Sequence, residues 1–312
     1  MVATINREVP MTSDAHHYRS LFYTAHDGLR LHMRDYGPRA SHALPVVCLP
    51  GLSRNSADFD VVARAMAGGS AGRARRVVAL DYRGRGLSDW DKDWTHYDMR
   101  TENLDILDVL TGAGVGEAIF LGTSRGGLHT MLLSATRPAI IRAAILNDIG
   151  PVIEQKGIAR IRGYVGKLPS PNSFADAADM MKTMMSAQFT ALTDADWDAY
   201  ARLTFEEKNG HLVARYDTAL SKPMESMDIE APLPTLWPQF EGLRNVPVLT
   251  LRGENSDLLS TATLDEMARR HPHCETFTVP GQGHAPILLD EPTIARISQF
   301  IAKVDGSEIT AR

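Results

Sequence analysis

The chain has few cysteines, no long hydrophobic run and no excess of positive charge. Its 312 residues include two cysteines, Cys48 and Cys274, both in strand-like apolar surroundings that favour a packing role over redox or metal chemistry. No apolar stretch approaches the roughly 18 residues that a membrane span needs, and the first 20 residues are polar. A net charge of -5 argues against a nucleic-acid surface. We therefore expect a soluble, cytoplasmic protein with neither a nucleic-acid nor a membrane partner.

Strand and helix patterns alternate along most of the chain, as they do in a doubly wound α/β sheet. Two short strands are expected between about residues 18 and 36. Further strands are expected near 45–49, 76–80, 117–121, 141–146, 246–251 and 275–279. Helical patterns occur near 56–67, 98–111, 125–137, 261–270 and 287–303. The sequence therefore predicts an α/β fold with a mostly parallel sheet flanked by helices.

One long segment interrupts this alternation. Between Asp148 and about Leu243 no strand of the main sheet is apparent, and the pattern is mostly helical. We expect residues 151–240 to form a helical cap on a core domain made of residues 18–150 and 241–312, with residues 1–17 as an N-terminal tail. Four methionines between residues 180 and 185 would either line a substrate pocket or pack inside the cap.

The run 122–126, GTSRG, predicts a sharp turn between a buried strand and a helix, with Ser124 at its apex. Glycines two residues before and two after the serine lack the Cβ atoms that would collide in such a turn. A serine hydroxyl is a weak nucleophile at neutral pH, so it needs a base that takes its proton and a carboxylate that orients the base. Ser124 is therefore a candidate nucleophile whose partners must lie elsewhere in the chain.

Candidates for both partners follow further along the chain, each just after a predicted strand. His284 lies in the loop after strand 275–279, and Asp257 lies in the loop after strand 246–251. The carboxyl ends of strands in an open α/β sheet form the ligand crevice, so these residues can converge on Ser124. Asp148, which follows strand 141–146, is an alternative acid, although Asp257 has the commoner position.

These features together resemble the α/β-hydrolase family, and the resemblance runs from about residue 19 to about residue 303. Residues 46–55 resemble the segment that supplies one oxyanion-hole amide in this family. Residues 79–89 resemble its Asp-x-Arg-Gly-x-Gly-x-Ser turn, in which Asp81, Arg83 and Ser88 are expected to have a structural role. The resemblance implies an α/β-hydrolase fold with an eight-stranded, mostly parallel sheet and a helical cap inserted after strand 6.

The resemblance also implies a mechanism that needs no metal and no organic cofactor. The expected oxyanion hole consists of the backbone N–H groups of Leu52 and Arg125. Two positions depart from the common family pattern. Pro50 replaces a frequent histidine, so the oxyanion loop needs a different support. The Arg125 guanidinium would either reach the pocket or lie solvated along the helix, and the second interpretation is favoured.

The expected function is a serine hydrolase, a carboxylesterase or lactonase that cleaves a small, largely apolar ester or lactone through an acyl-enzyme. Two alternatives remain at this stage. Hydrolases that cleave carbon–carbon bonds of ring-fission diketones use the same three residue types. A small-ligand receptor with weak turnover is also possible on this fold, because function resides in the site and not in the fold. The oligomeric state is not indicated by the sequence.

Overall fold

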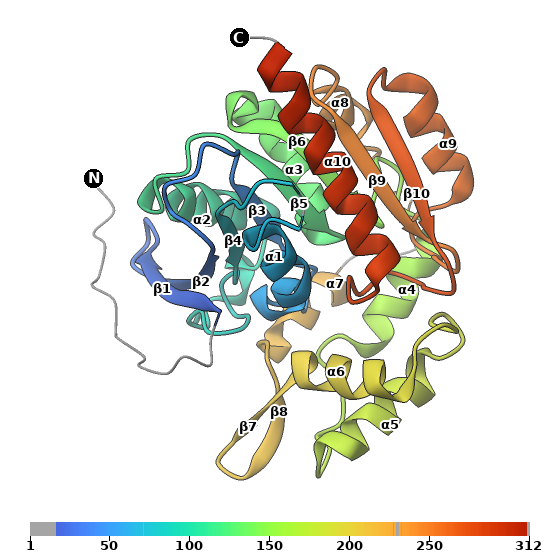
Figure 1. Ribbon diagram of the computed structural model, residues 1–312. Coiled ribbons are helices and arrows are strands. Elements are labelled where there is room, and N and C mark those ends of the chain that lie inside the picture. Colours follow the sequence, from blue (N-terminus) through green and yellow to red (C-terminus); the bar gives the residue numbers. More distant parts are fainter. Residues whose placement is uncertain (1–16, 71, 227, 229–230, 232, 311–312) are drawn as a thin grey trace.

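The central element of this computed structural model is an eight-stranded sheet (Figure 1). The structure describes residues 17–70, 72–226, 228, 231 and 233–310. The strand order is β1-β2-β4-β3-β5-β6-β9-β10. Only β2 runs against its neighbours, so the sheet is mostly parallel, as expected. The strands are β1 (Tyr18–Thr24), β2 (Arg30–Tyr36), β3 (Val46–Leu49), β4 (Val77–Leu80), β5 (Ala118–Thr123), β6 (Ile141–Asn147), β9 (Val248–Gly253) and β10 (Cys274–Val279).

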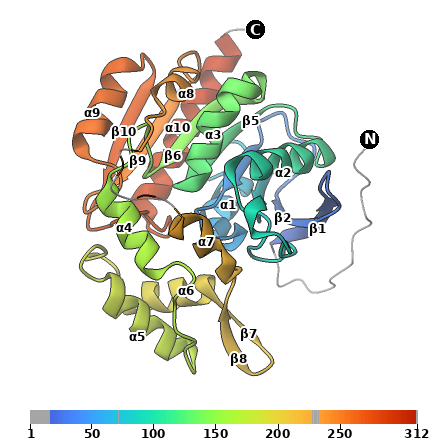
Figure 2. The same ribbon diagram turned by 180° about the vertical axis from the view of Figure 1, so that it is seen from behind.

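Helices cover both faces of this sheet (Figures 1 and 2). One face packs against α1 (Asp60–Ala67) and α10 (Glu291–Thr310). The other face packs against α2 (Met99–Gly112), α3 (Arg125–Thr136) and α9 (Thr261–Arg270). Strand β5 explains the two layers, because Ile119 and Leu121 point to the first face while Phe120 points to the second. The near-continuous apolar strands thus build two cores, one on each side of the sheet.

Side-chain caps fix where several core helices begin. Asp98 accepts hydrogen bonds from the backbone N–H groups of Arg100 and Thr101 at the start of α2. Ser260 likewise accepts from the N–H of Thr263 at the start of α9. These contacts satisfy donors that have no partner inside the helix. The expected starts at 98 and 261 therefore agree closely with the structure, whereas α10 begins later than the predicted residue 287.

Much of the segment between β6 and β9 lies beyond one end of the sheet, whereas its last helix packs beside the sheet against α3 (Figures 1 and 2). It includes α4 (Gln155–Tyr164), α5 (Phe174–Met185), α6 (Asp194–Thr204), α7 (Ser221–Glu225) and α8 (Trp237–Glu241). Met181, Phe189 and Trp197 belong to a small second core, whereas other buried residues of the segment, such as Ile161 and Phe240, join the main core. We call residues 151–240 the cap segment. That this segment acts as a cap over the site, and that the domains have the boundaries given above, are proposals.

The cap segment also contains a hairpin that the helical pattern did not predict. Strands β7 (Phe205–Lys208) and β8 (His211–Ala214) pair antiparallel around the dipeptide Asn209-Gly210. Both turn residues have positive φ, 53° for Asn209 and 76° for Gly210, which the tight two-residue hairpin turn requires. The Asn-Gly dipeptide was therefore a usable signal for a hairpin. The expected N-terminal tail, except for residue 17, lies outside the described residues.

Among the described residues, the helices are too short or too polar for any of them to traverse a lipid bilayer.

Candidate active site

Ser124 stands at the apex of a strained turn between β5 and α3. Its φ is 50° and its ψ is -111°, a conformation that side-chain-bearing residues rarely adopt. The turn requires glycine on both sides. A Cβ atom on Gly122 would collide with the backbone of Gly126, and one on Gly126 would come within 2.6 Å of the carbonyl carbon of Leu49. The sequence GTSRG thus folds into the sharp turn that its glycines predict.

His284 lies against Ser124. The hydroxyl of Ser124 is 2.9 Å from His284 Nε2, although the two residues are 160 positions apart in the chain. The loop after β10 that carries His284 is held by Glu254, whose carboxylate accepts a hydrogen bond from the N–H of Gly281 at 2.7 Å. His284 is 6% exposed, so the imidazole is largely shielded from water. The structure therefore brings together the nucleophile and base that the sequence indicates.

Asp148 is the carboxylate that contacts the histidine. Its Oδ2 lies 2.8 Å from His284 Nδ1. The same carboxylate accepts hydrogen bonds from the hydroxyl of Ser256 at 2.6 Å and from the N–H of Gly253 at 2.8 Å. Asp148 has no exposed surface. A buried carboxylate accepts hydrogen bonds only, so His284 donates from Nδ1 and presents the lone pair of Nε2 to Ser124.

Asp257 does not make the contact that its position in the sequence suggested. It forms a two-pronged ion pair with Arg160 of α4, with distances of 2.7 and 2.8 Å. Burial raises the pKa of Asp257, but the hydrogen bonds and charge of Arg160 lower it more, and the net pKa lies below its usual value. The preference for Asp257 over Asp148 is therefore corrected. The end of β9 and the loop after it hold Asp148, through Gly253 and Ser256, and do not supply the carboxylate that contacts His284.

The two residues expected to form the oxyanion hole flank Ser124. Gly51, which precedes Leu52, lies close enough that a Cβ built on it would be 3.9 Å from the Cβ of Ser124. Arg125 is the first residue of α3, so its N–H has no carbonyl partner within the helix. Arg85 Nε donates to the carbonyl oxygen of Leu52 at 2.8 Å. This contact provides the support for the loop that Pro50 cannot give.

The Arg125 side chain occupies neither of the positions considered for it. Its Nε atom donates to Glu102 at 2.6 Å, and its Nη2 atom donates to the carbonyl oxygen of Tyr97 at 3.3 Å. The side chain is 14% exposed while that of Glu102 is fully buried. The favoured expectation of a solvated guanidinium is therefore wrong, because the buried carboxylate of Glu102 on the neighbouring helix α2 draws it inward.

A cavity of about 110 Å³ opens above Ser124 and His284. Its apolar wall comes mainly from the cap segment and includes Leu168, Met181 and Met185. Its polar wall contains two arginines and three tyrosines, namely Arg54, Arg160, Tyr164, Tyr200 and Tyr216. The methionine cluster serves both expected purposes, since Met181 also packs in the core of the cap segment. The cavity is more polar than the sequence indicated.

Arg54 follows the expected oxyanion loop in the chain and lines this cavity. It holds Asp58 through two hydrogen bonds of 2.7 Å and donates to the hydroxyl of Thr204 at 2.6 Å. Its guanidinium carbon lies 4.4 Å from the ring centre of Tyr200. Arginine has five N–H donors, and these bonds use three of them. Arg54 thus links the loop after β3 to α6 and retains donors for a ligand.

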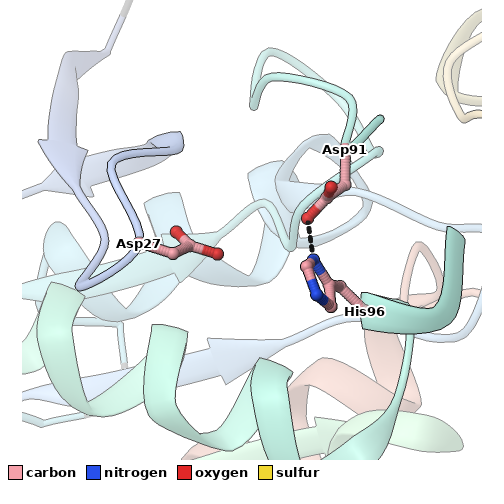
Figure 3. Close-up of side chains that lie close together, drawn as sticks. All are labelled: Asp27, Asp91 and His96. Atoms are coloured by element: carbon pink, nitrogen blue, oxygen red, sulfur yellow. Dashed lines mark hydrogen bonds and ion pairs between the residues drawn. The ribbon is translucent and has the colours of Figure 1, made fainter. Parts of the chain in front are cut away.

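A cluster of acidic residues and a histidine lies away from this cavity, between the turn that joins β1 to β2 and the segment after β4 (Figure 3). Asp27, Asp91 and His96 face one another, with 2.9 Å between His96 Nδ1 and Asp91 Oδ2. The guanidinium of Arg83 donates to Asp91 at 2.6 Å and to Asp27 at 2.8 Å. Because a fixed positive charge already binds these carboxylates, the group does not favour a metal ion. Arg83 has the structural role that its motif predicts.

A second hydrogen-bonded set of a serine, a histidine and an aspartate lies at the edge of the sheet. The hydroxyl of Ser20 is 2.8 Å from His32 Nε2, and His32 Nδ1 is 2.7 Å from Asp81. Ser20 lies in regular strand pairing opposite Arg34 and does not line the cavity around Ser124. The three residue types alone therefore do not define the candidate site. Its strained turn and its cavity distinguish it.

One protein-family model matches most of the chain. A family model described as "Alpha/beta hydrolase family" matches residues 46–295. Among curated proteins, a 3-hydroxybutyrate-oligomer hydrolase of Cupriavidus necator is 32% identical over 278 residues. That match covers 87% of this chain and 92% of the relative. A 2-(acetamidomethylene)succinate hydrolase of Mesorhizobium japonicum is 24% identical over 72% of this chain and 78% of its own length.

Comparison with solved structures also finds an alpha/beta hydrolase. A crystal structure of an alpha/beta hydrolase from Novosphingobium aromaticivorans superposes with a TM-score of 0.85 and 37% sequence identity. The superposition covers 91% of this chain and 98% of the other. The likeness therefore extends over the sheet and over most of the segment between β6 and β9.

Proposed function

Since the chain belongs to the alpha/beta hydrolase family and is an enzyme that acts on ester bonds, we propose that it is a serine hydrolase of hydroxy-acid esters. Ser124 would be the nucleophile, His284 the base and Asp148 the acid. The observation that carries this proposal is the chain of hydrogen bonds, 2.9 Å and 2.8 Å long, that joins the three residues beneath a cavity.

The proposed reaction follows from this geometry. The ester carbonyl would lie above Ser124, and Nε2 of His284 would take the hydroxyl proton as the Ser124 oxygen attacks. Asp148 would hold the Nδ1–H tautomer and stabilise the imidazolium that forms. Backbone N–H groups of Leu52 and Arg125 would bind the oxyanion of the tetrahedral intermediate. His284 would return its proton to the leaving alcohol and then activate water to release the acid from Ser124.

Two observations support a polar substrate rather than the largely apolar one expected from the sequence. The cavity wall contains the guanidinium groups of Arg54 and Arg160 beside three tyrosines, and although Asp58 and Asp257 pair with these arginines, each guanidinium keeps N–H donors that those carboxylates do not use. A linear ester of a short hydroxy acid has a carboxylate at one end and a hydroxyl at the other, and both can bind such groups. The curated relative with 32% identity is named as a 3-hydroxybutyrate-oligomer hydrolase. We therefore propose linear 3-hydroxybutyrate oligomers, or esters of similar length, as substrates.

The test is hydrolysis of the 3-hydroxybutyrate dimer and trimer beside their methyl esters and p-nitrophenyl butyrate. We expect turnover of all of them, with a higher kcat/KM for the free acids than for the methyl esters. A pre-steady-state burst of p-nitrophenol should appear with the wild type and vanish in Ser124→Ala. Equal kcat/KM for free acids and methyl esters would contradict the carboxylate preference, and absence of any burst or turnover would contradict the serine mechanism.

Ser20→Ala is the matched control for this experiment. It also removes a serine hydroxyl that lies 2.8 Å from a histidine Nε2, but Ser20 lies outside the cavity lining. We expect Ser20→Ala to retain the burst amplitude of the wild type. Loss of the burst in both variants would show that the assay reports on folding and not on the nucleophile.

A further inference from the structure

Glu102 is a buried carboxylate near the proposed site. The proposed roles of Ser124, His284 and Asp148 give it no function. It lies on α2 and is fully buried. Its Oε1 accepts from Arg85 Nη1 at 2.7 Å. Its Oε2 accepts from Arg125 Nε at 2.6 Å and lies 3.0 Å from His129 Nε2. Burying a carboxylate costs several kcal/mol unless such partners compensate, so this arrangement demands a reason.

The partners of Glu102 fix its charge. Burial raises the pKa of its carboxyl, but the charges of Arg125 and Arg85 and the contact with His129 lower it well below its usual value. Glu102 is therefore ionised at neutral pH. A permanent charge holds a guanidinium in a defined place, because the hydrogen bonds are charge-assisted and directional.

One arm of this network reaches the loop after β3. Arg85, also fully buried, donates from Nε to the carbonyl oxygen of Leu52 at 2.8 Å. Its Nη1 atom donates to the carbonyl oxygen of Arg83 as well as to Glu102. Arg85 is thereby fixed at three points. The loop residue that presents one proposed oxyanion donor is thus tied to the Glu102 carboxylate through a single side chain.

The other arm reaches the residue after the nucleophile. The Arg125 guanidinium is held by Glu102 and by the carbonyl oxygen of Tyr97. The backbone N–H of the same residue is the second proposed oxyanion donor. The first turn of α3 and the loop after β3 come from different parts of the chain, and Glu102 connects both of them through its two oxygens.

We propose that Glu102 is a positioning residue that sets the spacing between the backbone N–H groups of Leu52 and Arg125. This inference rests on the proposed serine mechanism and adds to it a residue that touches no substrate. Oxyanion donors act only when they lie about 2.7–3.1 Å from the developing charge, and losing one costs about 100- to 1,000-fold in rate. A displacement on the order of 1 Å can cost about 100-fold, so small movements of either arm slow acylation.

The test compares Glu102→Gln with the wild type in three measurements. The first is the acylation rate constant from the burst with p-nitrophenyl butyrate. The second is inhibition by butylboronic acid, which forms a tetrahedral adduct on the serine, and the third is inhibition by butyramide, which stays planar. We expect acylation to slow by about 10- to 100-fold and the boronic acid to bind more weakly by a similar factor. Butyramide binding should change little, because butyramide forms no tetrahedral adduct.

Asp105→Asn is the matched control, because Asp105 is also buried on α2 and is paired with an arginine through two hydrogen bonds. Its partner is Arg83, not a residue of the proposed oxyanion hole. We expect Asp105→Asn to lose about as much stability as Glu102→Gln. Its ratio of boronic acid affinity to butyramide affinity should equal that of the wild type. If Glu102→Gln keeps that ratio, or if Asp105→Asn changes it equally, the proposal is overturned.

Arg125→Met extends the test if Glu102→Gln does not fold. It removes one arm and leaves the pair of Arg85 and Glu102 in place, while the backbone N–H of residue 125 remains. A weaker loss in the same direction supports the proposal, and an unchanged affinity ratio overturns it. A wild-type protein with neither a burst nor turnover would contradict the serine mechanism itself, and this result differs from an unchanged affinity ratio in an active enzyme.

Discussion

Nδ1 of His284 lies 2.8 Å from the carboxylate of Asp148, a residue 136 positions earlier in the chain. Asp257 is only 27 positions before His284, but its carboxylate forms an ion pair with Arg160 instead. Both aspartates stand after strands that end at the same edge of the sheet, on β6 and β9 respectively. The tertiary contact, and not the order of residues in the chain, decides which carboxylate serves the histidine.

Substitution of the two aspartates by asparagine should therefore have unequal effects. We expect Asp148→Asn to lower kcat by about 10⁴-fold, because the amide no longer selects the productive histidine tautomer. Asp257→Asn should cause a much smaller loss, expressed mainly in KM, since it weakens the contact of α4 with the core. Steady-state kinetics with p-nitrophenyl butyrate measures both. The reverse order of effects would restore Asp257 as the acid.

The glycines of the turn give a second prediction. Gly126→Ala should destabilise the protein by about 1–3 kcal/mol and reduce the burst, because the new methyl group would collide with Leu49. Gly116→Ala is the control, since a Cβ atom at that exposed position meets no atom within 4 Å. Urea unfolding of both variants gives the free energies of unfolding. Equal stability of the two variants would be inconsistent with a tightly packed turn.

His129 predicts how stability depends on pH. Burial lowers its pKa from 6.5 to about 4, although the contact with Glu102 opposes this shift. The unfolded chain therefore binds a proton at higher pH than the folded protein does. As the pH falls from about 6.5 to about 4, this group should remove on the order of 3 kcal/mol of stability. Above pH 6.5 it has no effect, because it is neutral in both states.

His129→Gln tests this dependence. Urea unfolding at pH 7.5, 6 and 5 should show a shallower loss of stability in the variant than in the wild type. Parallel curves for the two proteins would mean that other groups determine the acid sensitivity. The variant retains a donor for Glu102, so the comparison isolates the proton uptake by the imidazole.

Arg83 supports a fourth prediction, because it is fully buried among three carboxylates. It forms two hydrogen bonds with Asp105 and one each with Asp27 and Asp91. Arg83→Met should cost roughly 3–5 kcal/mol, since it leaves buried charges without a partner. Arg30→Met removes an exposed ion pair with Asp89 and should cost about 0–1 kcal/mol.

The same cluster predicts the response to metal ions. Since Arg83 already binds Asp27 and Asp91, neither Mg²⁺, Ca²⁺ nor EDTA should shift the Tm of the wild-type protein. A rise in Tm with either ion would show that a cation competes with the guanidinium at this turn. Differential scanning calorimetry at constant ionic strength separates such binding from general salt effects.

Local patterns predicted the sheet, its flanking helices and the strained turn at Ser124. Those features depend on residues close in sequence: glycines at fixed spacing, apolar strands and caps such as Asp98 and Ser260. His284 was also accessible, since it follows a strand at the correct edge. The Asn209-Gly210 hairpin carried a local signal as well, but the helical pattern around it dominated the interpretation.

The partners of buried charges could not be predicted in the same way. Asp257, Arg125 and Glu102 each find a counter-charge or a hydrogen bond from a distant part of the chain. Such pairs have no periodicity, and the energy of burying a charge depends on the whole environment. The sequence therefore indicated which residues could act, whereas the fold decided which carboxylate meets which cation.

Strand β6 pairs directly with β9, with Ala144 opposite Val248 and Asn147 opposite Leu251. The sheet closes beneath the cap segment as though the intervening hundred or so residues were absent. Most of the cavity's apolar wall belongs to that insertion, while Ser124, Asp148 and His284 follow the ends of strands β5, β6 and β10. Changes in the length or composition of the insertion can therefore alter what the cavity accepts without moving the three proposed catalytic residues. The same division makes the segment a natural unit for exchange in engineering new specificities.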